Sequence, residues 1–154
     1  GNIARQFERT AAGRAAFGSL DELKDADFQL GLSNKLMGQV NLVRIGRQYV
    51  HDNGSFPLTS GVLSREPMKG SASISMVNAG LEGFARAAAL ELPRGIRINV
   101  VSPPWVTETL IARKMDPSIG LPAATVAQAY LAGVEGTATG QTIDPRTFAT
   151  GQRG

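Results

Sequence analysis

The sequence predicts an α/β domain with a parallel sheet, because strand-like and helix-like segments alternate along it. Residues 55–59 are short, apolar at alternate positions and bounded by glycines, which is typical of a buried strand. Residues 96–102 form a second apolar run that ends abruptly at Pro103-Pro104. A helix between two such strands implies a right-handed crossover, so we expect the strands to be parallel.

The composition is that of a globular protein. The chain has 154 residues, of which 42% are hydrophobic and 19% charged, and its mean hydropathy is −0.07. Its net charge of +3 comes from scattered residues, so we expect no nucleic-acid binding. No apolar run reaches the roughly 18 residues that span a bilayer, and we expect a cytoplasmic protein without a membrane partner. The sequence has no cysteine and only one histidine, so we expect no metal site.

The first residues predict short helices separated by breaks. Residues 2–9 can form two helical turns, and residues 10–13 then end them. Residues 21–23 favour another short helix, after which Asp27 is suited to the N-cap of a long one.

Two long helices are predicted by apolar residues at helical spacing, over residues 28–50 and 72–92. Both carry apolar or small residues on more than one face, which indicates that they are covered on more than one side. An irregular segment up to Pro122, a helix over residues 123–134 and a weak strand over residues 141–144 follow.

Seven short motifs occur in a fixed order along residues 10–143. They are Ala11-Ala12-Gly13, Lys35-Leu36-Met37-Gly38, Thr59-Ser60-Gly61, Asn78-Ala79-Gly80-Leu81, Ala89-Leu90-Glu91-Leu92, Arg97-Ile98-Asn99-Val100-Val101-Ser102-Pro103 and Gly140-Gln141-Thr142-Ile143. Together they resemble the short-chain dehydrogenase/reductase family. The resemblance implies a Rossmann-like parallel sheet with flanking helices, and hydride transfer between NAD(P) and a carbonyl or alcohol compound.

The resemblance also implies where catalysis would occur. Ser60 corresponds to the serine that polarises the substrate carbonyl, and Ile74, Asn78 and Lys35 occupy the positions of the family's tyrosine, lysine and asparagine. An isoleucine has no exchangeable proton, so the family's proton transfer cannot run in its standard form. Lys35 and Asn78 look like an exchange between two helices, and we expect their side chains to approach each other near Ser60. Ser60, Lys35 and Asn78 are therefore the candidate catalytic residues.

Each candidate also has a purely structural interpretation. Ser60 can be a strand-end hydroxyl that caps local backbone, Lys35 a solvated lysine and Asn78 a helix-packing amide. Trp105 can form a wall of the nicotinamide pocket or cover the core. Residues 110–122 resemble the substrate lid of the family.

The resemblance implies NADP or NAD as the cofactor. The candidate cofactor-binding residues are Ala12, Gly13, Pro103, Trp105, Thr107 and Thr109. The glycine-rich turn that binds the pyrophosphate in this fold does not occur in the sequence, and the family's first three strands have no counterpart before Thr10. We expect residues 1–154 to be one partial Rossmann-like domain, with the C-terminal half well represented and segments missing before residue 1 and between residues 9 and 10.

Two functions remain open at this point. The resemblance implies an NAD(P)-dependent oxidoreductase that acts on a small carbonyl or alcohol substrate. The alternative is a non-catalytic pseudoenzyme that acts as a ligand sensor or a dimeric interaction scaffold. In either case the extra faces of the helices over residues 28–50 and 72–92 resemble those through which family members form homodimers.

Overall fold

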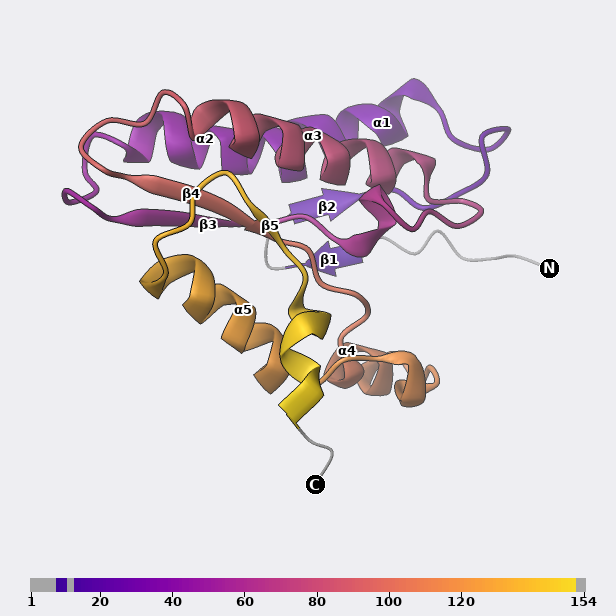
Figure 1. Cartoon of the computed structure of the whole chain (residues 1–154). Helices are drawn as coiled ribbons and strands as arrows, with labels where there is room; N and C mark the ends of the chain where they lie inside the picture. The colour runs from indigo at the N-terminus through magenta and orange to yellow at the C-terminus, as the bar shows by residue number, and fades with distance from the viewer. Residues whose placement is uncertain (1–7, 11–12, 152–154) are drawn as a thin grey trace.

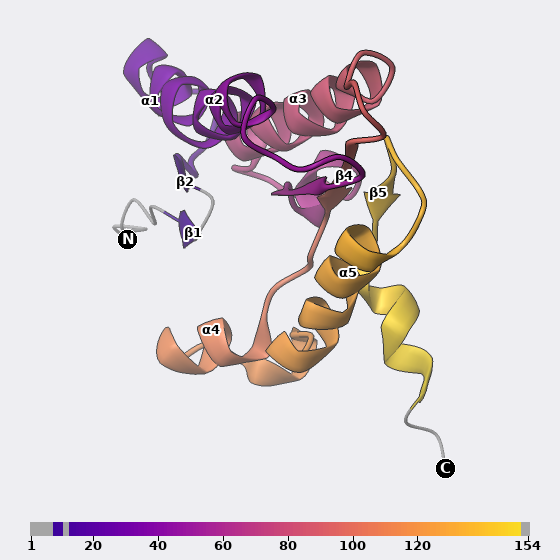
Figure 2. The ribbon, with the colours of Figure 1, turned by 90° about the vertical axis from the view of Figure 1, so that its left-hand side faces the viewer.

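The computed structural model of the chain describes residues 8–10 and 13–151. A layer of long helices covers one face of a parallel sheet, and helix α5 (Ala123–Glu135) packs on the opposite face (Figure 1; Figure 2). This is the Rossmann-like α/β arrangement that the alternation of strands and helices predicts, with helices on both faces.

The parallel sheet has three strands in the order β3-β4-β5. The strands are β3 (Ser55–Thr59), β4 (Arg97–Val101) and β5 (Thr142–Ile143). Thr59 lies opposite Val101, and Val101 lies opposite Ile143. The carboxyl ends of all three strands therefore meet at one edge of the sheet, which is where ligand sites form in open parallel sheets.

The predicted helix over residues 28–50 is a continuous helical segment in three parts. These are α1 (Asp25–Gly31), a π-helical turn (Leu32–Leu36) and α2 (Met37–Gly46). It starts earlier than predicted because Asp27 lies inside its first turn, where its carboxylate accepts a hydrogen bond from the Lys24 backbone N–H at 2.9 Å. It ends before residue 50, in a turn that leads to β3.

Helix α3 (Ala72–Ala88) connects β3 to β4 and is shorter than the predicted span of residues 72–92. Residues 89–92 form tight turns, one of them closed by the Leu90 N–H donating to the Ala87 carbonyl at 3.1 Å. A side chain at Gly80 would contact Leu36 at 3.3 Å, so this glycine permits close packing of α3 on the π-helical turn of the same chain.

The core lies between this helix layer and the sheet. Its buried residues are Val43, Phe56, Leu58, Leu81, Ala85, Ile96, Ile98 and Val100. They come from α2, α3, β3, β4 and the residue before β4, so apolar burial holds the two helices on the strands and fixes the position of the strand ends.

The N-terminal part of the structure differs from the prediction. Strands β1 (Glu8–Thr10) and β2 (Gly13–Ala15) form a short antiparallel pair, so the helix predicted over residues 2–9 is wrong at residues 8 and 9. Pairing between β1 and β2 gives hydrogen-bond partners to backbone N–H and C=O groups that would be unpaired at the end of a short helix. Residues 2–7 lie outside the described residues, and the segment expected between residues 9 and 10 stays a prediction.

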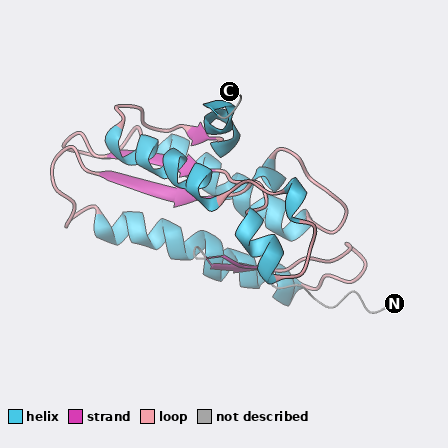
Figure 3. Ribbon diagram, turned by 90° about the horizontal axis from the view of Figure 1, so that it is seen from below, coloured by secondary structure: helices cyan, strands magenta, loops and turns pink. Residues whose placement is uncertain are grey.

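The segment after β4 is more regular than predicted. It contains helix α4 (Thr107–Ala112), joined to the start of α5 by the Thr107 N–H donating to the Leu121 carbonyl at 3.0 Å. Helix α5 and β5 agree with the predicted elements, and Figure 3 shows α5 in front of the sheet when the molecule is seen from below. No helix in the described part of the chain has the length and apolar character needed to cross a bilayer.

Candidate functional site

A cavity of about 290 Å³ lies at the carboxyl ends of β3 and β4. Its walls come from the π-helical turn, the residues that follow β3 and β4, the first turns of α3, and helices α4 and α5. It therefore occupies the edge of the sheet where the fold concentrates functional side chains.

Lys35 reaches the cavity from the π-helical turn and is only 3% exposed. Its Nζ donates a hydrogen bond to the Ser60 backbone carbonyl at 3.2 Å. π-Helical turns insert an extra residue into a helix and are frequent at functional sites. The structure thus directs this ammonium into the protein instead of into bulk solvent.

Gln39 lies one helical turn after Lys35 and completes the free edge of β3. The Thr59 N–H donates to its Oε1 at 2.8 Å, and its Nε2 donates to the Thr59 carbonyl at 3.0 Å. The amide therefore takes the place of a neighbouring strand at the residue that precedes Ser60. Gln39 was not among the predicted site residues, because its only signal in the sequence is an amide within a predicted helix.

Ser60 is held by a buried carboxylate. Its Oγ donates to Glu82 Oε1 at 2.9 Å, and the Ser64 Oγ donates to the same oxygen at 2.7 Å. Because a serine hydroxyl has one proton, Ser60 in this arrangement offers only lone pairs to a further partner. Glu82 was not among the predicted site residues either. We call Lys35, Gln39, Thr59, Ser60 and Glu82 the polar base of the site.

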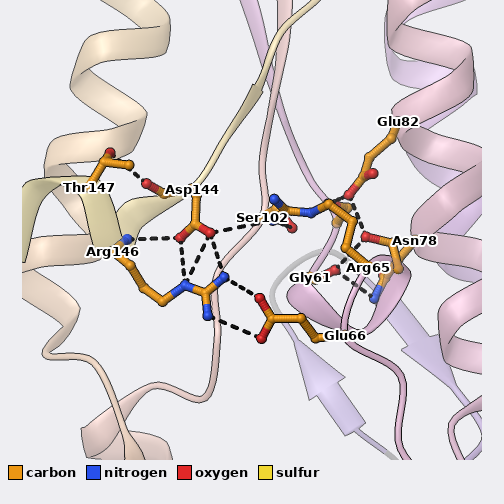
Figure 4. Close-up of polar contacts among 11 residues, drawn as sticks. Gly61, Arg65, Glu66, Asn78, Glu82, Ser102, Asp144, Arg146 and Thr147 are labelled. Carbon is orange, nitrogen blue, oxygen red and sulfur yellow. Dashed lines mark hydrogen bonds and ion pairs between the residues drawn. The ribbon is translucent and has the colours of Figure 1, made fainter.

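Ile74 and Asn78 on α3, which we expect at the positions of the family's tyrosine and lysine, also line the cavity. Ile74 is 1% exposed. The Asn78 Nδ2 donates to the Gly61 carbonyl at 3.4 Å, while its buried Oδ1 has no hydrogen-bond partner among the described residues (Figure 4). A side chain at Gly61 would lie 3.0 Å from the Asn78 Nδ2, so this glycine leaves room for the amide. Lys35 and Asn78 therefore bond to successive carbonyls at the end of β3, and a buried acceptor is left without a donor.

The candidate cofactor residues divide into two groups. Pro103, Trp105 and Thr109 line the cavity. Thr107 begins α4 outside the cavity wall, and Gly13 lies in β2. Ala12 lies outside the described residues. The structure thus brings three of the six residues to the site.

Two further cavity residues were not predicted. The Tyr130 hydroxyl on α5 lies 2.5 Å from the Thr59 Oγ1. Burial raises the pKa of Tyr130, and the hydrogen bond with Thr59 partly opposes that shift. Arg113 follows α4 and lines the cavity from that side. Neither residue belongs to a motif in the sequence. They reach the cavity only because the fold places α4 and α5 near the end of β3.

A group of charged residues lies beside the end of β4, and we call Arg65, Glu66, Asp144 and Arg146 the ionic cluster (Figure 4). Arg146 bonds to Asp144 at 2.7 Å and to Glu66 at 2.5 Å. These hydrogen bonds lower the pKa of both carboxyls. Arg65 lies 3.6 Å from Asp144 and donates to the Ser102 Oγ at 3.0 Å, which ties the cluster to β4.

The described residues contain no cluster of histidine and carboxylate side chains suited to hold a metal ion.

The chain is similar to known dehydrogenases. The family model described as enoyl-(acyl carrier protein) reductase matches residues 7–139. The solved structure of the protein lin1944 from Listeria innocua is 40% identical with a TM-score of 0.81, and the match covers 87% of this chain and 68% of that one. A small-chain dehydrogenase in complex with NADPH is 26% identical with a TM-score of 0.75, over 88% of this chain and 68% of that one. No curated protein matches the chain.

Proposed function

Because the chain belongs to the short-chain dehydrogenase/reductase family, we propose that it is an NAD(P)-dependent oxidoreductase acting on a carbonyl or alcohol compound. The chain spans about two thirds of the length of the solved structures reported above, so the activity is proposed for the full-length protein. The observation that supports the proposal is the cavity at the ends of β3 and β4, where Lys35 and Asn78 meet the wall formed by Pro103 and Trp105.

The residues present fit the nicotinamide end of a dinucleotide. The unpartnered Oδ1 of Asn78 is a buried acceptor, and a ribose hydroxyl is a donor of suitable chemistry. Trp105 and Pro103 offer apolar surface for a flat ring, and Thr109 adds a hydroxyl. When bound, the dinucleotide would supply or accept a hydride.

Lys35 is the residue that we assign to the reacting oxygen. Its Nζ bonds to the Ser60 carbonyl and Lys35 lines the cavity, which places the ammonium at the end of β3 beside a bound ligand. A preorganised donor in a buried site stabilises negative charge that develops on a carbonyl oxygen. In the alcohol direction, the Ser60 Oγ accepts a hydrogen bond from the substrate hydroxyl, because its own proton is directed to Glu82.

Titration of the full-length protein with NADPH and NADH tests cofactor binding. A cofactor that binds only the folded protein raises its stability by about 2.7 kcal/mol at a hundredfold excess over Kd, which a thermal-shift assay detects. Trp105→Ala should weaken this shift, whereas Tyr49→Ala, at an exposed aromatic residue outside the cavity, should leave it unchanged. Absence of any shift at millimolar NADPH and NADH would refute cofactor binding.

Substitution at the altered positions tests the chemistry. Ile74→Tyr combined with Asn78→Lys restores a phenol and a lysine one helical turn apart, and should raise turnover of a generic carbonyl compound by about 10² or more, the usual contribution of a positioned acid. Turnover that stays at the wild-type level would mean that more than a proton donor is lacking.

A non-catalytic ligand sensor is the second candidate. It is favoured by the buried Ile74 at the tyrosine position and by the Ser60 proton, which is directed to Glu82 and away from a carbonyl. A protein that is stabilised by NADPH but oxidises none of it with a broad panel of carbonyl compounds would support this function over the first.

We also propose a cytoplasmic homodimer that uses α2 and α3. Leu42 and Ile45 on α2 are 58% and 62% exposed, and Met76 on α3 is 40% exposed. Burial of such side chains against a second copy is favourable. Light scattering on the full-length protein should give a dimer that Leu42→Glu with Ile45→Glu converts to a monomer; a wild-type monomer would contradict this.

A further inference from the structure

The charged side chains that line the cavity are both cations. Lys35 lines it from the π-helical turn and Arg113 from the end of α4. No acidic residue is among the described residues of the wall. Glu82 binds the Ser60 hydroxyl without lining the cavity, and with its carboxylate included the site still has one excess positive charge.

The remaining wall is mainly apolar. Leu63, Trp105 and Val126 contribute side chains from the segments that follow β3 and β4 and from α5. A ligand that fills this cavity therefore meets apolar surface over its body and positive charge at two separate wall segments. Such walls favour a molecule with an apolar body and an anionic group.

We propose that the substrate of this site is a carbonyl or alcohol compound that carries a carboxylate on an apolar body, and that Arg113 binds the carboxylate. This inference rests on the proposed function. Among the side chains that the structure describes, no ion pair involves the Arg113 guanidinium, and we infer that its planar set of donors serves a ligand in the cavity. A guanidinium binds a carboxylate through two parallel hydrogen bonds, which also orients the substrate. Arg113 and Lys35 come from different walls of the cavity, so the carboxylate and the reacting oxygen would lie at separate places.

The same two cations suit a phosphate of the dinucleotide, and the two sources of negative charge need to be separated. A carboxylate site for substrate and a cofactor site are occupied together in a reacting complex. Binding of an acid that persists when NADP⁺ is saturating therefore belongs to the substrate site, and binding that NADP⁺ abolishes belongs to a cofactor phosphate.

The experiment compares phenylpyruvate with phenylacetone, which have the same ring and ketone but differ in the carboxylate. Calorimetry on the full-length protein with saturating NADP⁺, which has the phosphates of NADPH but no hydride to transfer to a ketone, should show that the acid binds about tenfold or more tightly than the neutral ketone. Arg113→Gln should remove this preference, whereas Lys114→Gln, which deletes the neighbouring exposed charge outside the cavity, should retain it. Added salt should lower the affinity for phenylpyruvate but not the affinity for phenylacetone.

Equal affinities for the two compounds, equal effects of Arg113→Gln and Lys114→Gln, or loss of acid binding at saturating NADP⁺ would overturn the inference. Its failure is distinct from that of the proposed function. The proposed function fails if neither NADPH nor NADH binds, which calorimetry without phenylpyruvate measures. If neither binds but the protein still prefers phenylpyruvate to phenylacetone, the carboxylate site at Arg113 stands without the proposed function.

Discussion

The polar base and the ionic cluster lie at the same end of the sheet but differ in solvent exposure. Lys35 and Ser60 in the polar base are each 3% exposed, whereas the side chains of Arg146 and Glu66 are 43% and 54% exposed. A hydrogen bond lost from a buried site leaves an unpaired polar group, which costs about 1–3 kcal/mol, while exposed ion pairs contribute about 0–1 kcal/mol. The polar base, with fewer charges, should therefore contribute more to the local structure of the site.

The largest effect is expected at Gln39, because one side chain bonds both backbone groups of Thr59. Gln39→Ala should lower the free energy of unfolding by about 2–3 kcal/mol, measured by urea denaturation with an unchanged m-value. Asn41→Ala is the matched control, since this amide accepts only an exposed hydrogen bond from Arg44, and its effect should stay within about 0.5 kcal/mol. Equal effects of the two substitutions would remove the contrast between the two regions.

An intermediate effect is expected at Tyr130, which is half-buried. Tyr130→Phe removes its hydrogen bond with Thr59 and should cost about 1 kcal/mol at neutral pH. The pKa of Tyr130 is raised in the folded protein, so its contribution is complete below the unfolded pKa of about 10 and is lost as pH rises above that value. The stability difference between wild type and Tyr130→Phe should therefore narrow above pH 10; a difference that widens there would show that the ionised phenol is favoured.

The smallest effect is expected in the ionic cluster. Arg146→Ala removes the partner of two carboxylates, yet should lower stability by at most about 1 kcal/mol at pH 7 and by less at high salt. The pKa of Asp144 is lowered by Arg146, so this contribution is present above the unfolded pKa of about 4 and is lost as pH falls below it.

Denaturation of wild type and Arg146→Ala at pH 7 and pH 3 checks both statements. The difference in stability between the two proteins should be smaller at the lower pH, because protonation of Asp144 begins to remove its contribution. A loss at pH 7 as large as that of Gln39→Ala would mean that the exposed cluster, through the contact of Arg65 with Ser102, holds the end of β4 as firmly as the polar base holds β3.

The sheet and its crossover helix could be predicted because their signals are local. Apolar runs bounded by glycine and proline marked β3 and β4, and helical spacing marked α3 and α5. The pairing of β1 with β2 could not be predicted, because residues 8 and 9 are also compatible with a helix. Only their pairing with residues 13–15 makes them a strand. Helix α4 was not predicted because it has only six residues, too few to show a clear helical spacing of apolar residues.

The candidate site was predictable where it follows motifs. Ser60, Ile74 and Asn78 could be placed by order and spacing, and the structure brings all three to one cavity together with Lys35. The polar partners were not predictable in the same way. Glu82 looked like one acid on a helix, and its role as acceptor for two serines depends on where β3 ends relative to α3.

The sequence alone determined the family and the parallel α/β fold, because both depend on residue types at positions that motifs and apolar runs define; that Ile74 takes the place of the family's proton donor stays a prediction. The tertiary structure decided the hydrogen-bond partners and the burial of the polar side chains at the site. It directs the Ser60 proton to Glu82, turns Lys35 inward through a π-helical turn, and adds Arg113 and Tyr130 from helices far along the chain. The physical reason is that hydrogen-bond direction and burial depend on atoms that meet only when the helices pack on the sheet.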